Sequence, residues 1–328
     1  SLLRLLEVAL HNVRAFHQEH AVGTEWQRLK SLRVDNLDRN GVRLVDQRLG
    51  DRQAHAQAEA DLAAEDAGLR RAFADAEAVE AVIGKERPEA VINCAAWTDV
   101  DGCERDPEKA RRENALGPEN LARASRNAGA VLITISTDYV FDGKKEGFYT
   151  QRDQPNPISV YGNFKLEGER RAQSEHARTI VVRTGYIFGP GGKNFLSNVV
   201  SLVEGGQKLK AISDYWGTPT YGRDLAHRLR ELAQLDLPGV YHVVNSGDGA
   251  SFETFSVEAL RLAGLSADGI EVIEGDSLGR PAPRPRNSRM KCLVSEAIGL
   301  APLPPWQESL AHFINHGHKE AQKAHNLS

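Results

Sequence analysis

Tyr161 and Lys165 are the residues of this sequence whose types and spacing point most directly to chemistry. They are four positions apart, so on a helix they lie on the same face, about one turn from each other. A neighbouring ammonium favours the phenolate and lowers the pKa of a tyrosine from its ordinary value of about 10. A tyrosine tuned in this way can protonate a carbonyl oxygen at neutral pH. The pair therefore predicts an acid catalyst, and the competing interpretation is a half-buried tyrosine beside a solvated lysine.

The order of other residues along the chain favours the catalytic interpretation. Ala95 and Ala96 follow an apolar run and are small enough for a flat cofactor to approach the backbone, and Thr137 follows a second apolar run. In an open parallel sheet, ligands bind outside the carboxyl ends of the strands, so these residues would converge with Tyr161. Thr137 would hydrogen-bond the oxygen that Tyr161 protonates while a hydride reaches the carbon. Lys165 would also hold the ribose hydroxyls of a nicotinamide cofactor, NADPH or NADH.

The elements that must position these residues can be predicted from residue 88 onward. Short apolar runs alternate there with amphipathic stretches, which is the pattern of βαβ units that build a parallel sheet. The expected strands are residues 89–95, 130–136, 179–184 and 239–244, and the expected helices are residues 106–129, 157–175 and 224–235. We therefore predict an α/β fold, a Rossmann-type doubly wound parallel sheet with a smaller substrate-binding lobe.

The overall composition excludes several classes of protein. Apolar residues make up 41% and charged residues 26% of the 328 residues, and no apolar run approaches the ~18 residues needed to cross a bilayer. The net charge of −4 gives no case for nucleic acid or a membrane as a partner. Three cysteines are too few for a disulfide framework or a four-ligand zinc site. We predict a cytoplasmic enzyme with no signal peptide and no metal site.

Three segments carry a family resemblance: residues 93–101 (NCAAWTDVD), 136–143 (STDYVFDG) and 160–169 (VYGNFKLEGE). They resemble successive signatures of the dTDP-4-dehydrorhamnose reductases, a nucleotide-sugar branch of the extended short-chain dehydrogenases and reductases. The next segments of that family resemble residues 183–189, 214–220 and 239–242. The resemblance runs from about residue 76 to residue 313. The segments point to the reductases only when they are taken together, because related epimerases and dehydratases share the tyrosine and the lysine.

The resemblance implies a role for each matching residue. Tyr161 is implied to be the proton donor, Lys165 its partner and a ribose contact, and Thr137 a helper at the sugar carbonyl. The other implied contacts are Ala95, Ala96 and Thr98 along the cofactor, and Asp138, Tyr186, Arg280, Arg284 and Arg286 at the substrate. Guanidinium groups suit a diphosphate because they bind it in a bidentate way. The alternative for the three arginines is a solvated proline-rich loop.

The implied activity is the NAD(P)H-dependent reduction of dTDP-4-dehydro-L-rhamnose, a dTDP-linked 4-keto-6-deoxy sugar, to dTDP-L-rhamnose. Two alternatives stay open: a nucleotide-sugar epimerase or dehydratase, and a non-catalytic relative such as the regulatory subunit of methionine adenosyltransferase. Asp138, directly after Thr137, favours the reductase over the epimerases. The intact Thr137, Tyr161 and Lys165 argue against a regulatory role, which has no need of them. The expected assembly is a homodimer.

Residues 1–75 depart from the family pattern. A reductase of this kind begins with a strand and a Gly-x-x-Gly-x-x-Gly turn, whose backbone N–H groups bind the cofactor pyrophosphate. Here the glycines are Gly23, Gly41, Gly50 and Gly68, and no apolar strand precedes any of them. Two explanations are open. We favour a segment translated in the wrong reading frame of the gene, which joins the correct frame near residues 74–77. The alternative is a genuine variant that no longer holds the cofactor. We expect this segment to be helical or disordered.

The expected organisation has four parts. Residues 1–75 form the atypical N-terminal segment without the glycine-rich fingerprint, and residues 317–328 form a tail. Residues 76–188 and 218–248 form the Rossmann-type core. Residues 189–217 and 249–316 form the substrate-binding lobe.

Overall fold

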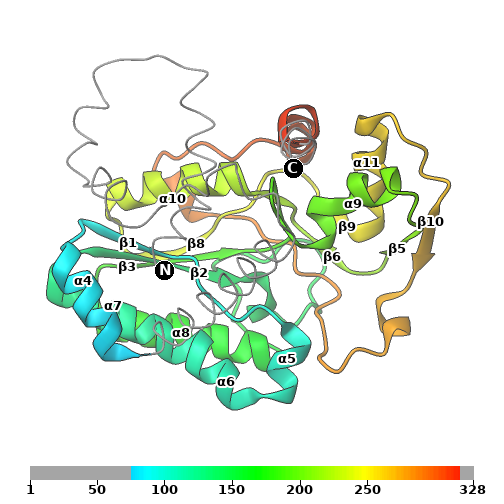
Figure 1. The fold of residues 1–328 in the computed structure, drawn as a ribbon. Helices are drawn as coiled ribbons and strands as arrows, with labels where there is room; N and C mark the ends of the chain where they lie inside the picture. The colour runs from blue at the N-terminus through cyan, green and yellow to red at the C-terminus, as the bar shows by residue number, and fades with distance from the viewer. Residues whose placement is uncertain (1–74, 318–328) are drawn as a thin grey trace, which may run out of the picture.

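A four-stranded parallel sheet lies at the centre of the computed structural model, which describes residues 75–317 (Figure 1). The strand order is β1-β2-β3-β8, and the bounds are Ala90–Asn93, Val131–Thr137, Thr179–Thr184 and Gly239–His242. All three pairings are parallel; Ile133 of β2, for example, lies between Ile92 and Ile180. The α/β fold predicted from the apolar runs is confirmed, and each expected strand lies close to its predicted bounds.

Helices cover both faces of this sheet (Figure 1). One face carries α4 (Ala76–Glu86), α7 (Gly117–Ala128) and α8 (Val160–Glu175), and the other carries α10 (Gly222–Leu235). The adjacent residues Leu132 and Ile133 of β2 point to opposite faces, and each belongs to a separate buried apolar cluster. Because both faces are covered, β2 is almost wholly buried, which explains why its sequence lacks a polar–apolar alternation.

A long helical segment connects β1 to β2. It consists of α5 (Val100–Arg105), α6 (Pro107–Arg111), the π-helical turn η1 (Arg112–Leu116) and α7. Pro107 lies in the first turn of α6, and Gly129 ends α7 in the left-handed conformation with φ 72°, as their positions in the sequence predicted. The helix α5 and the π-helical turn were not predicted from the sequence.

A smaller lobe packs at one end of the sheet (Figure 1). The short helix α12 (Val294–Ala297) packs on the α10 face of the sheet. The helices of the smaller lobe are α9 (Phe195–Glu204), α11 (Phe252–Ala263) and α13 (Trp306–His312), followed by the π-helical turn η4 (Phe313–Gly317). Its short strands pair as β4 (Ile187–Phe188) with β7 (Thr220–Tyr221), β5 (Leu209–Ile212) with β10 (Ile270–Ile273), and β6 (Trp216–Gly217) with β9 (Ala250–Ser251). Phe188, Phe255 and Trp306 form the aromatic centre of the core that holds these elements together.

The expectations for residues 1–74 and 318–328, including the missing glycine turn, lie outside the described residues. Within residues 75–317, no helix combines the length and the apolar character needed to cross a bilayer. Cys94, Cys103 and Cys292 all carry free thiols.

Candidate active site

Three side chains that were predicted to act together lie at the carboxyl end of the sheet. Thr137 is the last residue of β2, and Tyr161 and Lys165 lie in the first two turns of α8. Ser159 caps that helix, because its hydroxyl accepts a hydrogen bond from the amide of Gly162 at 3.1 Å. Thr137, Tyr161 and Lys165 are buried, with 5%, 8% and 4% of their surfaces exposed. The hydroxyls of Tyr161 and Thr137 share a hydrogen bond.

Gly162 allows α8 to approach the end of β2 closely. A Cβ atom at this position would lie 2.3 Å from the carbonyl oxygen of Tyr139, in the 3-10 turn η2 (Asp138–Val140). Gly168, further along α8, allows a similarly close approach to the π-helical turn η1, where a Cβ atom would lie 2.2 Å from the carbonyl oxygen of Asn114. A larger side chain at Gly162 would therefore push Tyr161 away from Thr137.

The pKa of Tyr161 is raised rather than lowered. Burial raises it above its ordinary value, the hydrogen bond with Thr137 lowers it, and the nearby carboxylate of Asp138 raises it further. The predicted net lowering of this pKa is therefore wrong, because burial outweighs the influences that lower it. The Lys165 ammonium donates to the carbonyl oxygen of Ile135 at 2.7 Å. Tyr161 accordingly holds its proton at neutral pH, which is the state that a proton donor needs.

Several polar side chains at the carboxyl end of the sheet have hydrogen-bond donors or acceptors that are not used within the described residues. The Lys165 ammonium has three donors, and within residues 75–317 it makes the one hydrogen bond to Ile135. Burial lowers the pKa of Lys165 to about 8, although Glu169 and Cys94 act to raise it. The buried hydroxyls of Ser136 and Thr184 have no hydrogen-bond partner in the described part of the chain. Buried polar groups are normally paired, so this arrangement fits the nicotinamide riboside end of a dinucleotide.

The loop after β1 contains the small residues predicted to lie along the cofactor. Ala95 and Ala96 are partly buried there, and Thr98 is exposed. Asn114 fixes the loop: its side-chain amide accepts from the Trp97 N–H and donates to the Trp97 carbonyl, both at 2.9 Å. Asn114 lies in the π-helical turn η1 and is 1% exposed, and such turns occur often at functional sites. The only sequence signal for this residue was a polar amide in the middle of a helix.

Asp138 is the most deeply enclosed acid of the site, with 3% of its surface exposed. One carboxylate oxygen accepts from the Thr137 hydroxyl at 3.0 Å and the other accepts from the Ser288 hydroxyl at 2.5 Å. Burial raises the pKa of Asp138 to about 6, against the lowering effect of those two hydrogen bonds. Its contact with the substrate stays a prediction, whereas its pairing with Ser288 could not be predicted from the sequence.

Tyr186 lies between β3 and β4 with strained backbone geometry. Its φ is 49°, in the left-handed region that disfavours a bulky residue. Its hydroxyl donates to the carbonyl oxygen of Tyr215 at 3.2 Å, and its ring centre lies 4.8 Å from that of Phe252. Such strain is typical of functional sites, and the contact of Tyr186 with the sugar stays a prediction.

The three arginines predicted to bind a diphosphate have different environments. Arg284 is 9% exposed and forms a bidentate ion pair with Asp101, at 2.6 and 2.8 Å. Arg286 is 57% exposed and pairs with Asp214 at 2.7 Å. Arg280 lines a cavity of the smaller lobe. The solvated-loop alternative therefore describes Arg286 well but not Arg284, whose guanidinium is already neutralised within the chain.

The ion pair of Asp101 and Arg284 predicts a pH dependence of stability. Hydrogen bonds from Arg284 lower the pKa of Asp101 to about 2, so the pair contributes about 2 kcal/mol above pH ~4 and loses it as the pH falls towards 2. We expect Asp101→Asn to flatten this acid limb when the free energy of unfolding is measured against pH. Asp276→Asn is the control, because its pair with Arg286 is exposed and should contribute little. Equal effects of the two substitutions would contradict this assignment.

Comparison with known proteins gives the chain relatives over most of its length. The family description "RmlD substrate binding domain" matches residues 46–319. A dTDP-4-dehydrorhamnose reductase from Streptomyces griseus is 37% identical over 242 residues, which are 72% of this chain and 79% of that protein.

Solved structures give the same picture. The crystal structure of a dTDP-4-dehydrorhamnose reductase from Bacillus anthracis, in complex with NADP, is 32% identical with a TM-score of 0.71, and the match covers 74% of this chain and 86% of that one. A UDP-glucose 4-epimerase from Thermotoga maritima, 19% identical with a TM-score of 0.64 over 76% of this chain and 83% of that one, shares the fold. With a family match over more than half its length and relatives above 30% identity, the chain belongs to the dTDP-4-dehydrorhamnose reductase family.

Proposed function

We propose that this chain reduces the 4-keto group of dTDP-4-dehydro-L-rhamnose with NADPH or NADH and releases dTDP-L-rhamnose. The observation that carries the proposal is the convergence of Tyr161, Thr137 and Lys165 at the carboxyl end of the sheet, in a chain of the reductase family. The likeness to the epimerase is one of fold alone, so it does not favour a second function.

In this proposal each side chain of the site has a separate role in the reduction. A bound reduced nicotinamide supplies the hydride. Tyr161, which holds its proton because burial raises its pKa, donates that proton to the sugar oxygen as the carbonyl is reduced. Thr137 hydrogen-bonds Tyr161 and orients its hydroxyl. Lys165 turns its remaining donors to the ribose hydroxyls, and Ala95 and Ala96 leave room for the cofactor along the backbone.

The nucleotide part of the substrate fits a cavity of about 230 Å³ in the smaller lobe. Phe195, Phe252 and Leu278 give it apolar walls, and Lys210 and Arg280 add positive charge. Pockets for whole drug-sized ligands measure ~300–1,000 Å³, so this cavity suits one portion of the substrate. We place the thymine base against the apolar walls and the diphosphate near the cations.

The direct test is the loss of NADPH or NADH absorbance when the purified chain meets dTDP-4-dehydro-L-rhamnose. We expect one cofactor molecule to be oxidised for each dTDP-L-rhamnose formed, as measured by chromatography of the product. Binding of both cofactor and substrate without any oxidation of the cofactor would refute the proposal.

The pKa of Lys165 predicts how cofactor affinity depends on pH. With a pKa of about 8, the ammonium is about nine-tenths protonated at pH 7 and about one-tenth at pH 9. We therefore expect the dissociation constant of the reduced cofactor, measured by its fluorescence, to rise about tenfold between pH 7 and pH 9. Lys165→Arg, which stays charged, should remove this dependence. An unchanged slope in that variant would assign the titration to another group.

Three further expectations belong to this proposal. The core of residues 76–188 and 218–248 holds the cofactor, and the lobe of residues 189–217 and 249–316 holds the nucleotide sugar. The homodimer stays a prediction that light scattering can test. The cytoplasmic location also stays a prediction, based on the cysteine usage.

A further inference from the structure

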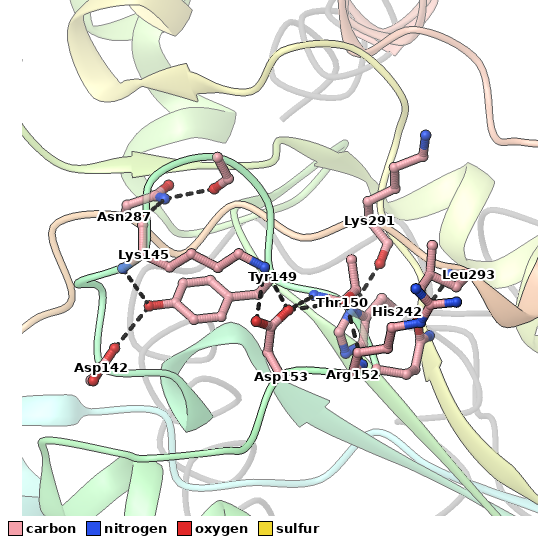
Figure 2. A network of polar contacts seen from close by, with 12 residues as sticks. Asp142, Lys145, Tyr149, Thr150, Arg152, Asp153, His242, Asn287, Lys291 and Leu293 are labelled. Carbon is pink, nitrogen blue, oxygen red and sulfur yellow. Dashed lines mark hydrogen bonds and ion pairs between the residues drawn. The ribbon is translucent and has the colours of Figure 1, made fainter.

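One extended segment, residues 284–290, bridges the sheet-bearing core and the smaller lobe; we call it the strap. On the core side, Arg284 pairs with Asp101, and the Asn287 side chain donates to the carbonyl oxygens of Lys145 and Gly147 at 2.6 and 2.7 Å. Figure 2 shows Asn287 directed at the backbone of Lys145. These contacts fix the strap against α5 and against the loop that follows β2.

On the lobe side, the strap continues the hydrogen bonding of a short strand. The backbone N–H of Trp216 in β6 donates to the Arg286 carbonyl at 2.8 Å, and the N–H of Ser288 donates to the Trp216 carbonyl at 2.7 Å. The Met290 N–H donates to the Thr218 hydroxyl at 3.0 Å. Ser288 is therefore held from both sides and is 2% exposed.

The Ser288 hydroxyl begins a chain of hydrogen bonds that leads to the proposed acid. It donates to one carboxylate oxygen of Asp138, and the other oxygen of Asp138 accepts from the Thr137 hydroxyl. Thr137 in turn shares a hydrogen bond with Tyr161. The carboxylate has little room to move, because a Cβ atom at Gly185 would lie 2.5 Å from its carbon.

This chain determines how the Thr137 hydroxyl is oriented. A threonine hydroxyl has one proton and two acceptor sites. Its proton is directed to Asp138 at 3.0 Å, and one acceptor site takes the N–H of Tyr139 at 3.1 Å. Because Asp138 takes this proton, the Thr137 hydroxyl is held in one orientation beside the Tyr161 hydroxyl, with which it shares a hydrogen bond. A carboxylate that rotated away would release the Thr137 proton and change this arrangement.

We propose that Ser288 is a positioning residue for the reduction: through Asp138 it fixes the Thr137 hydroxyl, and Thr137 aligns the Tyr161 hydroxyl with the sugar oxygen. The inference rests on the proposed function and extends it, since it makes the strap part of the catalytic apparatus. A residue that acts in this way changes the rate of the chemical step more than the binding of the substrate.

The chain offers a closely matched control for this proposal. Ser309 of α13 is also buried, at 5% exposed, and its hydroxyl donates to a carboxylate oxygen of Asp224 at 2.5 Å. That hydrogen bond has the same chemistry and the same length as the one from Ser288 to Asp138, but Asp224 lies in α10 and its carboxylate accepts its other hydrogen bond from Asn245 rather than from Thr137. Ser309→Ala therefore measures the cost of losing a buried serine–aspartate hydrogen bond without disturbing the site.

The experiment compares kcat, KM and thermal stability of Ser288→Ala, Ser288→Thr and Ser309→Ala. We expect Ser288→Ala to lower kcat about 10- to 100-fold with KM for the sugar nucleotide within about threefold, as for the loss of an orienting hydrogen bond. Ser288→Thr, which keeps the hydroxyl, should recover most of kcat. Ser309→Ala should lose a similar amount of stability while keeping kcat. Equal kcat values for the two alanine variants would overturn the proposal.

A second variant tests the same chain if Ser288→Ala cannot be recovered folded. Asp138→Asn should lower kcat with KM retained, because the amide still fills the space beside Gly185 but cannot accept from both hydroxyls through two oxygens. A rise in KM with kcat unchanged would instead identify Asp138 as a direct substrate contact and would overturn the relay. Turnover by the unmodified chain, measured first, tests the proposed function separately from this inference.

Discussion

Replacing Tyr161 with phenylalanine is expected to lower kcat about 10²- to 10⁴-fold, the usual contribution of a positioned general acid. Phenylalanine keeps the ring and its edge-to-face contact with Tyr139, whose ring centre lies 6.0 Å away, so the fold should persist. The substitution removes only the hydroxyl that we propose as the proton donor, together with its hydrogen bond to Thr137. The measurement is cofactor oxidation at saturating substrate, together with cofactor binding by fluorescence, which should change little.

Tyr149→Phe is the matched control for that substitution. Tyr149 is also buried, at 4% exposed, and its hydroxyl donates to Asp142 at 2.8 Å in the network that Figure 2 shows. This network joins the loop after β2 to His242 of β8 and to Asn287, Lys291 and Leu293, and neither Tyr161 nor Lys165 is among its labelled residues. The control should lose stability but keep kcat. If both tyrosine variants turned over at the same rate, Tyr161 would not be the acid.

Removing Glu169 is expected to have the largest effect on stability. Its carboxylate forms a buried ion pair with Arg183 at 2.7 Å, in which the side chains are 3% and 7% exposed. Breaking a buried pair leaves an uncompensated charge and costs about 3–5 kcal/mol, which corresponds to a fall in Tm of roughly 6–20 °C for a domain of this size. The measurement is thermal and urea unfolding of Glu169→Ala.

The pair of Glu258 with Arg261 provides the comparison for Glu169. Its two residues lie three positions apart in α11, and Arg261 is 65% exposed. Water screens such a pair, so Glu258→Ala should cost at most about 1 kcal/mol. Similar losses for the two glutamate variants would mean that the buried pair adds nothing beyond an exposed one.

The parts of the fold that were predicted correctly are those governed by local patterns. A strand buried on both faces has a largely apolar run, and residues 131–137 and 179–184 contain such runs, Val131–Ile133 and Ile180–Val182. Pro107 and Gly129 mark helix boundaries for reasons that lie within one turn of each residue. The same locality allowed Tyr161 and Lys165 to be placed on one helical face beside the end of β2.

The parts that could not be predicted depend on distant contacts. The shift in the pKa of Tyr161 follows burial by surrounding segments, which the spacing of Tyr161 and Lys165 does not reveal. Arg284 was predicted to bind a diphosphate, and its partner in the structure is Asp101, 183 positions earlier. Asn114 needs its π-helical turn to reach Trp97, and no sequence pattern indicates such a turn in a helix of ordinary composition.

The strap has a consequence for how the protein is made on the ribosome. Ser288 and Asp138 are 150 positions apart, and a ribosome adds about 5–20 residues per second, so roughly 8–30 s separate the synthesis of the two partners. β1 and β2 are complete before that interval begins and β3 is completed within it, but until Ser288 is added Asp138 has no hydroxyl from the strap. If Ser288 positions Thr137 as proposed, nascent chains stalled before residue 288 would contain Tyr161 and Lys165 without an aligned acid, and catalysis would require almost the whole chain.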